Sequence, residues 1–152
     1  MLLLRRIRAA GLASLILSLV ACGGPIVMIP GGELSGKVEA VPSDWSFTDS
    51  VETMQLETRP ADPYSVNIWG ASVGDRFYIG CGNPEKGWCK YVLEDPNVRL
   101  RVNDSIYELR AEPIENEPEL EAYLAGLKKK YDREVSPEER GQAVAFALTA
   151  RE

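Results

Sequence analysis

The absence of histidine limits the chemistry of this sequence, which has three cysteines and 23 Asp and Glu carboxyl groups among its 152 residues. Without an imidazole, the chain cannot build a Ser-His-Asp or Cys-His nucleophile, and it lacks the commonest general base near neutral pH. It also has neither a P-loop nor a Gly-x-Gly-x-x-Gly turn. No catalytic residue is assigned, and we expect a bound cofactor to supply the reactive atoms if the domain is an enzyme.

The first cysteine, Cys22, ends a segment with the features of a secretory signal. Arg5, Arg6 and Arg8 precede an apolar stretch over residues 9–21, which is shorter than the ~20 apolar residues that span a bilayer. The stretch ends in Leu-Val-Ala directly before Cys22, and two glycines follow. This pattern resembles the lipobox of bacterial lipoproteins, in which the cysteine is acylated and becomes the mature N-terminus.

The lipobox resemblance implies three parts: a signal peptide over 1–21, a lipidated tether over 22–35, and a single domain over 36–152. Several acyl chains on Cys22 would hold the domain at a lipid bilayer, whereas one chain gives only marginal binding. Gly23 follows the cysteine where an aspartate would retain the protein at the inner membrane. The expected location is therefore the cell envelope, at the periplasmic face of the outer membrane if the host is Gram-negative.

The charge balance argues against a nucleic-acid partner. Three of the 17 basic residues and none of the 23 acidic residues lie in 1–21, so the remaining chain has a formal net charge of −9. An acidic domain repels phosphate backbones, and the only basic run, Lys128-Lys129-Lys130, fits the C-terminal end of a helix.

Cys81 and Cys89 form an even pair once Cys22 carries lipid. In an exported protein such a pair predicts a disulfide, here closing a short loop that contains glycine and proline. The alternative is a redox-active or metal-binding pair. It lacks the Cys-x-x-Cys spacing, and no histidine can complete a zinc site, so no metal site is predicted.

Most of the domain is predicted to be β-structure, because short apolar or alternating runs are separated by turn residues. Asn103-Asp104 suits a two-residue hairpin, since both residue types tolerate a positive φ. The predicted strands are 36–41, 52–58, 64–71, 76–79, 98–102 and 105–111, with a closing strand over 143–150. This last segment is ambiguous, because its alanines favour helix.

Two helices are predicted between and after these strands. A short one over 88–93 carries Trp88 and stops before Asp95-Pro96. A longer one begins at the potential cap Asn116, and a helical turn follows at Ser136. The longer helix has an apolar stripe, which we interpret as ordinary core, at Leu120, Tyr123, Leu124, Leu127 and Tyr131.

The order of these elements resembles a known architecture. A hairpin, the strand Asp75-Arg76-Phe77-Tyr78-Ile79, a Trp-bearing helix and the phrase Asp95-Pro96-Asn97-Val98 are similar to the split β-barrel of pyridoxamine-phosphate-oxidase-like proteins. That family includes FMN-binding reductases and deazaflavin-dependent nitroreductases. The resemblance implies an α+β, mainly β fold: a split β-barrel of six to seven strands with one packed helix and a short Trp-bearing helix.

The same resemblance implies a flavin site, FMN or a deazaflavin, at the interface of a homodimer. Basic and hydroxyl groups would hold the phosphate, and aromatic side chains would face the ring. The residues so implicated are Thr58, Arg59, Trp69, Tyr78, Lys86, Trp88 and Lys90. Each has a structural alternative: the arginine and lysines as solvated charges, and the aromatic residues as packing in the core or at the barrel mouth.

Two hypotheses therefore stand at this point. In the first, the protein is a membrane-anchored oxidoreductase that uses a flavin to reduce a small acceptor. In the second, the barrel holds no cofactor and is a binding or structural module of the cell envelope.

Overall fold

The computed structural model describes residues 29–85 and 87–151. The predicted signal peptide, Cys22 and Lys86 lie outside the described residues, and the predicted boundaries of signal, tether and domain stay predictions. Within these two ranges, no helix is both long enough and apolar enough to cross a bilayer.

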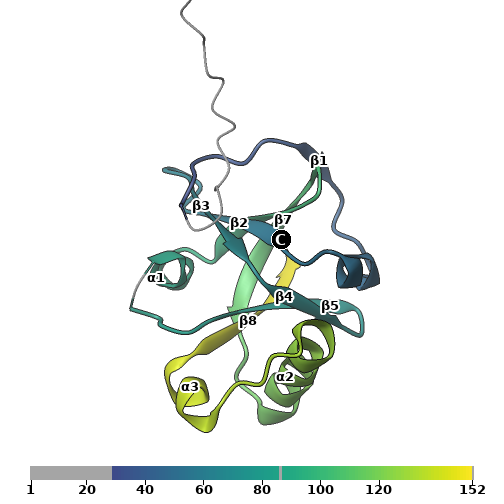
Figure 1. The fold of residues 1–152 in the computed structure, drawn as a ribbon. Helices are drawn as coiled ribbons and strands as arrows, with labels where there is room; N and C mark the ends of the chain where they lie inside the picture. The colour runs from purple at the N-terminus through teal and green to yellow at the C-terminus, as the bar shows by residue number, and fades with distance from the viewer. Residues whose placement is uncertain (1–28, 86, 152) are drawn as a thin grey trace, which may run out of the picture.

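One strongly curved sheet forms the body of the protein, in the strand order β3-β2-β6-β7-β8-β5-β4, and the short β1 pairs in parallel with β7 (Figure 1). All other strand pairings are antiparallel. Because this one sheet contains eight strands within the described residues, the predicted mainly β fold is confirmed. The strands are β1 (Lys37–Glu39), β2 (Met54–Thr58), β3 (Tyr64–Ile68), β4 (Gly70–Val73), β5 (Arg76–Cys81), β6 (Asn97–Val102), β7 (Ser105–Pro113) and β8 (Val144–Ala150).

The sheet curls so far that its two edges meet in the chain at Trp69. β3 and β4 are the outermost strands of the order above, yet Trp69 alone separates them in sequence. The single strand predicted over 64–71 is therefore two strands on opposite edges. The sequence pattern could not show this, because the apolar alternation continues through the crossing point.

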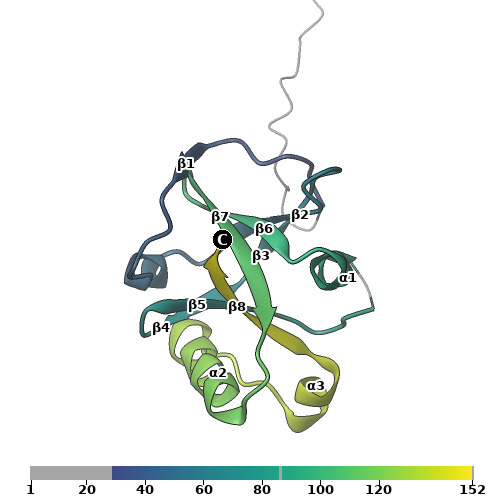
Figure 2. The ribbon, with the colours of Figure 1, turned by 180° about the vertical axis from the view of Figure 1, so that it is seen from behind.

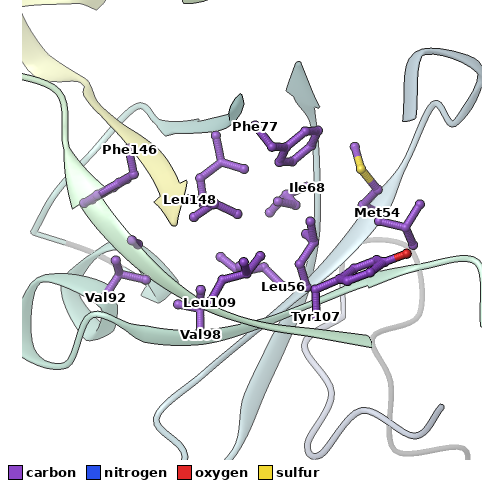
Figure 3. Packing of buried hydrophobic residues seen from close by; sticks show 14 of the residues in the cluster. Met54, Leu56, Ile68, Phe77, Val92, Val98, Tyr107, Leu109, Phe146 and Leu148 are labelled. Atoms are coloured by element: carbon purple, nitrogen blue, oxygen red, sulfur yellow. The ribbon is translucent and has the colours of Figure 1, made fainter. Parts of the chain in front are cut away.

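The inward faces of the strands form the main core, where side chains from β2, β3, β5, β6, β7 and β8 converge (Figure 3). The alternation read from the sequence predicts these positions correctly, as in β2, where Met54, Leu56 and Thr58 are all buried. Val92 and Cys89 of the helix α1 (Gly87–Glu94) are also buried in this core. Side chains that Figure 3 labels include Phe77, Val98, Tyr107, Leu109, Phe146 and Leu148.

Two further helices cover the other end of the sheet, below β4, β5 and β8 in Figure 1. In α2 (Glu117–Tyr131), the Asn116 side chain accepts a hydrogen bond from the Glu119 backbone N–H, which confirms the predicted cap. In α3 (Pro137–Gln142), Ser136 and Glu139 form a capping box. A 3₁₀ helix, η1 (Ser46–Ser50), precedes β2. The ambiguous C-terminal segment is a strand, as predicted, because β8 pairs with both β5 and β7.

Residues 31–37, which we call the strap, cross the outer face of β3, β2, β6 and β7. Gly31 exchanges two backbone hydrogen bonds with Ser65 of β3, and the Lys37 N–H donates to the Asp104 carbonyl beside β7. Leu34 is buried midway, and its N–H donates to the Glu57 carboxylate of β2. In Figures 1 and 2 this segment arcs from the β3 side of the sheet to β1.

Candidate functional site

A cavity of about 570 Å³, here called the aromatic cavity, lies between α1, α2, α3 and the ends of β3, β5 and β8. Its volume is in the range of small-molecule sites. Aromatic walls come from three different elements: Trp69 between β3 and β4, Trp88 in α1, and Tyr123 in α2. The other lining residues used below are Asn67, Cys81, Leu124, Leu127, Arg133, Glu139 and Gln142.

Trp69 is held as one wall by a parallel stack. Its ring lies 4.8 Å from the ring of Tyr131, with 10° between the two planes, and the residue is 50% exposed. The Tyr131 hydroxyl hydrogen-bonds to Gly70 and Glu52, and the Lys130 ammonium donates to the Gly70 and Thr48 carbonyls. The end of α2 therefore fixes the crossing point, and Trp69 presents a supported aromatic face.

Trp88 is positioned by the short helix α1, which the predicted disulfide joins to the barrel. Cys81, the last residue of β5, bonds to Cys89, with 6.1 Å between their Cα atoms. The Trp88 ring also lies 6.3 Å from that of Phe146 in β8. Both cysteines are buried, which fits the prediction of a structural disulfide.

Among the described residues that line the cavity, the charged side chains are those of Arg133 and Glu139, which form an ion pair with each other. Burial raises the pKa of Tyr123, so its hydroxyl is protonated at neutral pH and can act as a hydrogen-bond donor. Asn67 and Gln142 add carboxamides. The cavity therefore has the character of a binding site with mostly apolar walls.

The structure brings Trp69 and Trp88 together but places Thr58 and Arg59 elsewhere. The Thr58 hydroxyl is buried and donates to the Tyr64 carbonyl at the end of β2. The Arg59 guanidinium pairs with Asp62 at 3.1 Å and lies over the rings of Tyr64 and Tyr91. Neither residue lines the aromatic cavity.

The remaining predicted residues are dispersed. Tyr78 is buried beneath α2, where its hydroxyl donates to Glu119 at 3.0 Å, and burial is the largest cause of its raised pKa. Lys90 is exposed, and its ammonium lies 3.8 Å from the Glu94 carboxylate one helical turn away. The cofactor roles of all seven residues stay predictions.

Sequence reasoning did not find Tyr123, Arg133 or Gln142 as cavity residues. Tyr123 belongs to the apolar stripe of α2, interpreted above as core, and this side of the helix faces both core and cavity. Arg133 and Gln142 stand in no recognisable motif, so the sequence offered no signal for them. Over residues 29–85 and 87–151, no cluster of three or more Cys, Asp or Glu side chains could hold a metal ion.

Comparison with known proteins shows the fold. Neither a protein-family model nor a curated protein matches this sequence. Among solved structures, a Listeria innocua protein provisionally assigned as a pyridoxamine 5'-phosphate oxidase aligns with a TM-score of 0.54 and 17% identity over 70% of this chain and 90% of its own. An FAD-binding protein from Mesorhizobium loti gives 0.52 and 12% over 70% and 86%. An F420 reductase gives 0.50 and 18% over 73% and 95%. The chain therefore has the predicted split-barrel fold.

Proposed function

We propose that this protein is an envelope-anchored split-barrel protein that binds a flavin-type ring, FMN or a deazaflavin, in the aromatic cavity. The observation that carries the proposal is the convergence of Trp69, Trp88 and Tyr123 on one cavity of about 570 Å³. The similar folds of an FAD-binding protein and an F420 reductase support the choice of ligand class.

The residues present fit the ring of such a cofactor. A tricyclic ring is flat and largely apolar, and stacking on indole or phenol rings is favourable. Trp69 offers a ring already supported by Tyr131. The carboxamides of Asn67 and Gln142 can form hydrogen bonds with a polar ring edge.

Among the residues that the structure describes, one cation is available to the phosphate of FMN at this cavity, Arg133, because Arg59 lies outside it. Arg133 would have to exchange its Glu139 partner for the phosphate. Since that exchange offsets part of the gain, the ring is expected to contribute more to affinity than the phosphate does.

A bound flavin would supply hydride or electron transfer. The protein's own contribution is to bind and orient the ring and to exclude water with Leu124 and Leu127. The protonated Tyr123 hydroxyl would donate a hydrogen bond. The homodimer implied by the family resemblance belongs to the same proposal, and light scattering of the purified protein tests it.

The test is a titration of the purified protein with FMN, riboflavin and an F420-type deazaflavin, in which quenching of tryptophan fluorescence reports binding. Trp69→Leu and Trp88→Leu are each expected to raise the Kd about tenfold, as loss of one stacking contact implies. Phe47→Leu, an exposed aromatic residue in η1 away from the cavity, is the matched control. Absence of saturable binding for all three flavins would refute the proposal.

The anchoring part of the proposal rests on Cys22. Gly31, where the strap joins the sheet, lies nine positions after Cys22, and this stretch of chain can span at most ~30 Å. The domain would therefore lie close to the bilayer. Metabolic labelling with a palmitate analogue should mark the wild type and not Cys22→Ser. A native product that still begins at Met1 by mass spectrometry would contradict it.

A second function, a cofactor-free binding module, is favoured by one observation. Arg133 and Glu139 neutralise each other, so the cavity offers aromatic and apolar surface with little net charge. Such a site suits an uncharged apolar molecule. This second function predicts that an uncharged apolar fluorescent dye binds in the cavity. Trp69→Leu should weaken binding of the dye, and none of the three flavins should displace it.

A further inference from the structure

We propose that Arg59 is a positioning residue that acts through Tyr91 on the Trp88 wall of the aromatic cavity. The inference rests on the proposed ligand-binding function and assigns a role to a residue that does not itself line the cavity. It replaces the expectation, drawn from the family resemblance, that Arg59 binds a phosphate group directly.

The Arg59 guanidinium is held by aromatic rings. Its central carbon lies 4.2 Å from the centroid of the Tyr91 ring in α1 and 5.6 Å from that of Tyr64 in β3. The two tyrosine rings meet edge to face at 5.1 Å. The Arg59 Nε is buried and has no hydrogen-bond partner within the described part of the chain. Ring contacts of this kind are favourable for a planar cation.

The backbone directs Arg59 toward α1. Its φ is 55°, in the left-handed region that non-glycine residues seldom occupy. The Asp62 N–H donates to the Arg59 carbonyl and the Asp62 carboxylate pairs with its guanidinium, so the turn between β2 and β3 is closed on itself. An uncommon backbone conformation persists where surrounding contacts determine it.

The helix that receives Arg59 is too short to hold its own orientation. α1 has eight residues, fewer than an isolated helix needs for stability in water. Tertiary contacts must therefore orient it: the disulfide at Cys89, the buried Val92, and the Arg59 contact at Tyr91. Trp88 precedes Tyr91 by three residues, which places the two side chains on neighbouring parts of the helix surface.

It follows that Arg59, the disulfide and the buried Val92 together fasten α1, and that Trp88 keeps its place in the cavity wall through all three. Without Arg59, the helix loses the contact on its Tyr91 side and can tilt enough to displace the Trp88 ring. The positive charge of Arg59 is not sufficient for this role. The flat face of its guanidinium is needed as well, because a lysine ammonium cannot stack on a ring in the same way.

The first experiment needs no ligand. The chain has three tryptophans, so 5-fluorotryptophan labelling gives three ¹⁹F resonances, assigned with Trp69→Phe and Trp88→Phe. Arg59→Ala should shift or broaden the Trp88 resonance and leave that of the buried Trp45 unchanged, which also reports an intact core.

Three further variants separate stacking from charge. Tyr91→Leu should reproduce the change, whereas Tyr91→Phe, which keeps the ring, should not. Arg59→Lys keeps the cation and should not restore the wild-type Trp88 resonance; it also replaces Arg59→Ala if that variant does not fold. An unchanged Trp88 resonance in Arg59→Lys and Tyr91→Leu would overturn the proposal.

The second experiment compares FMN with riboflavin, which has the same ring and no phosphate. A positioning role predicts that Arg59→Lys weakens both ligands by a common factor of about five to ten. Direct phosphate binding predicts little loss for riboflavin and a loss for FMN only in Arg59→Ala, and that result would overturn the inference. If the wild type binds neither ligand, the proposed function fails, and the ¹⁹F result still decides the role of Arg59.

Discussion

Replacement of the buried Glu57 by glutamine is expected to destabilise the protein by about 3 kcal/mol. Glu57 is 3% exposed, and its two carboxylate oxygens lie 3.0 and 3.1 Å from Nη1 of Arg99. The same carboxylate accepts the N–H of Leu34 in the strap. Glutamine keeps the shape and one acceptor oxygen but removes the negative charge that balances Arg99.

The magnitude follows from the surroundings of Arg99. Breaking a buried ion pair on one side costs about 3–5 kcal/mol, because the remaining charge is left uncompensated. The Arg99 side chain is 17% exposed, and the Glu33 carboxylate lies 3.9 Å away, so the lower end of that range applies. For a domain of this size, a loss of 3 kcal/mol lowers the Tm by roughly 10 °C.

Equilibrium urea unfolding measures this loss. The matched control is Glu108→Gln. Glu108 lies on the same face of the sheet, but its side chain is half exposed, and its carboxylate is 3.9 Å from the Arg151 guanidinium. This control should change the free energy of unfolding by less than about 0.5 kcal/mol. The double variant Glu57→Leu/Arg99→Met should recover part of the stability, because it leaves no unpaired charge. If Glu57→Gln cost no more than the control, the assignment of a stabilising buried pair beneath the strap would be wrong.

Three other outcomes are expected. Gly70→Ala should destabilise by about 2 kcal/mol or more in the same urea assay, because a Cβ there would lie 2.4 Å from the Phe77 ring, whereas Gly82→Ala, with open space around it, should be nearly neutral. The double variant Cys81→Ala/Cys89→Ala should lower the free energy of unfolding by about 2–3 kcal/mol, because the loop is no longer constrained. Equal stability of the wild type and this variant would exclude a structural disulfide. Hydrogen bonds from Asn116 and Tyr78 and the nearby Arg76 lower the pKa of Glu119 below its ordinary 4.5. The Glu119 carboxylate therefore stabilises the fold above pH 4.5, and this stabilisation is lost as the pH falls through the folded-state pKa. The Glu119→Gln variant should lose less stability than the wild type between pH 5 and 3, and identical acid-unfolding profiles of the two proteins would contradict this.

Features whose causes lie within a few residues of one another could be predicted from the sequence. The cap at Asn116 and the apolar spacing of Tyr123 and Leu127 specify α2, because both depend on the 3.6-residue period. The Asn103-Asp104 hairpin and the alternation in β2 are local in the same sense. The disulfide followed from the number of cysteines and their expected compartment alone, and the order of elements was enough to recognise the split barrel.

How residues far apart in the chain combine depends on the closure of the sheet and on contacts between distant segments. Ser65 is fully buried although it falls on the outer side of its strand, because the strap covers it. Trp69 and Trp88, two of the candidate site residues from the sequence, line the same cavity. They do so because the sheet closes at Trp69 and the disulfide holds the helix that carries Trp88. Arg59 stacks on Tyr91 and so leaves the cavity. Strand register and sheet closure set these distances, and neither is encoded in any short stretch of sequence.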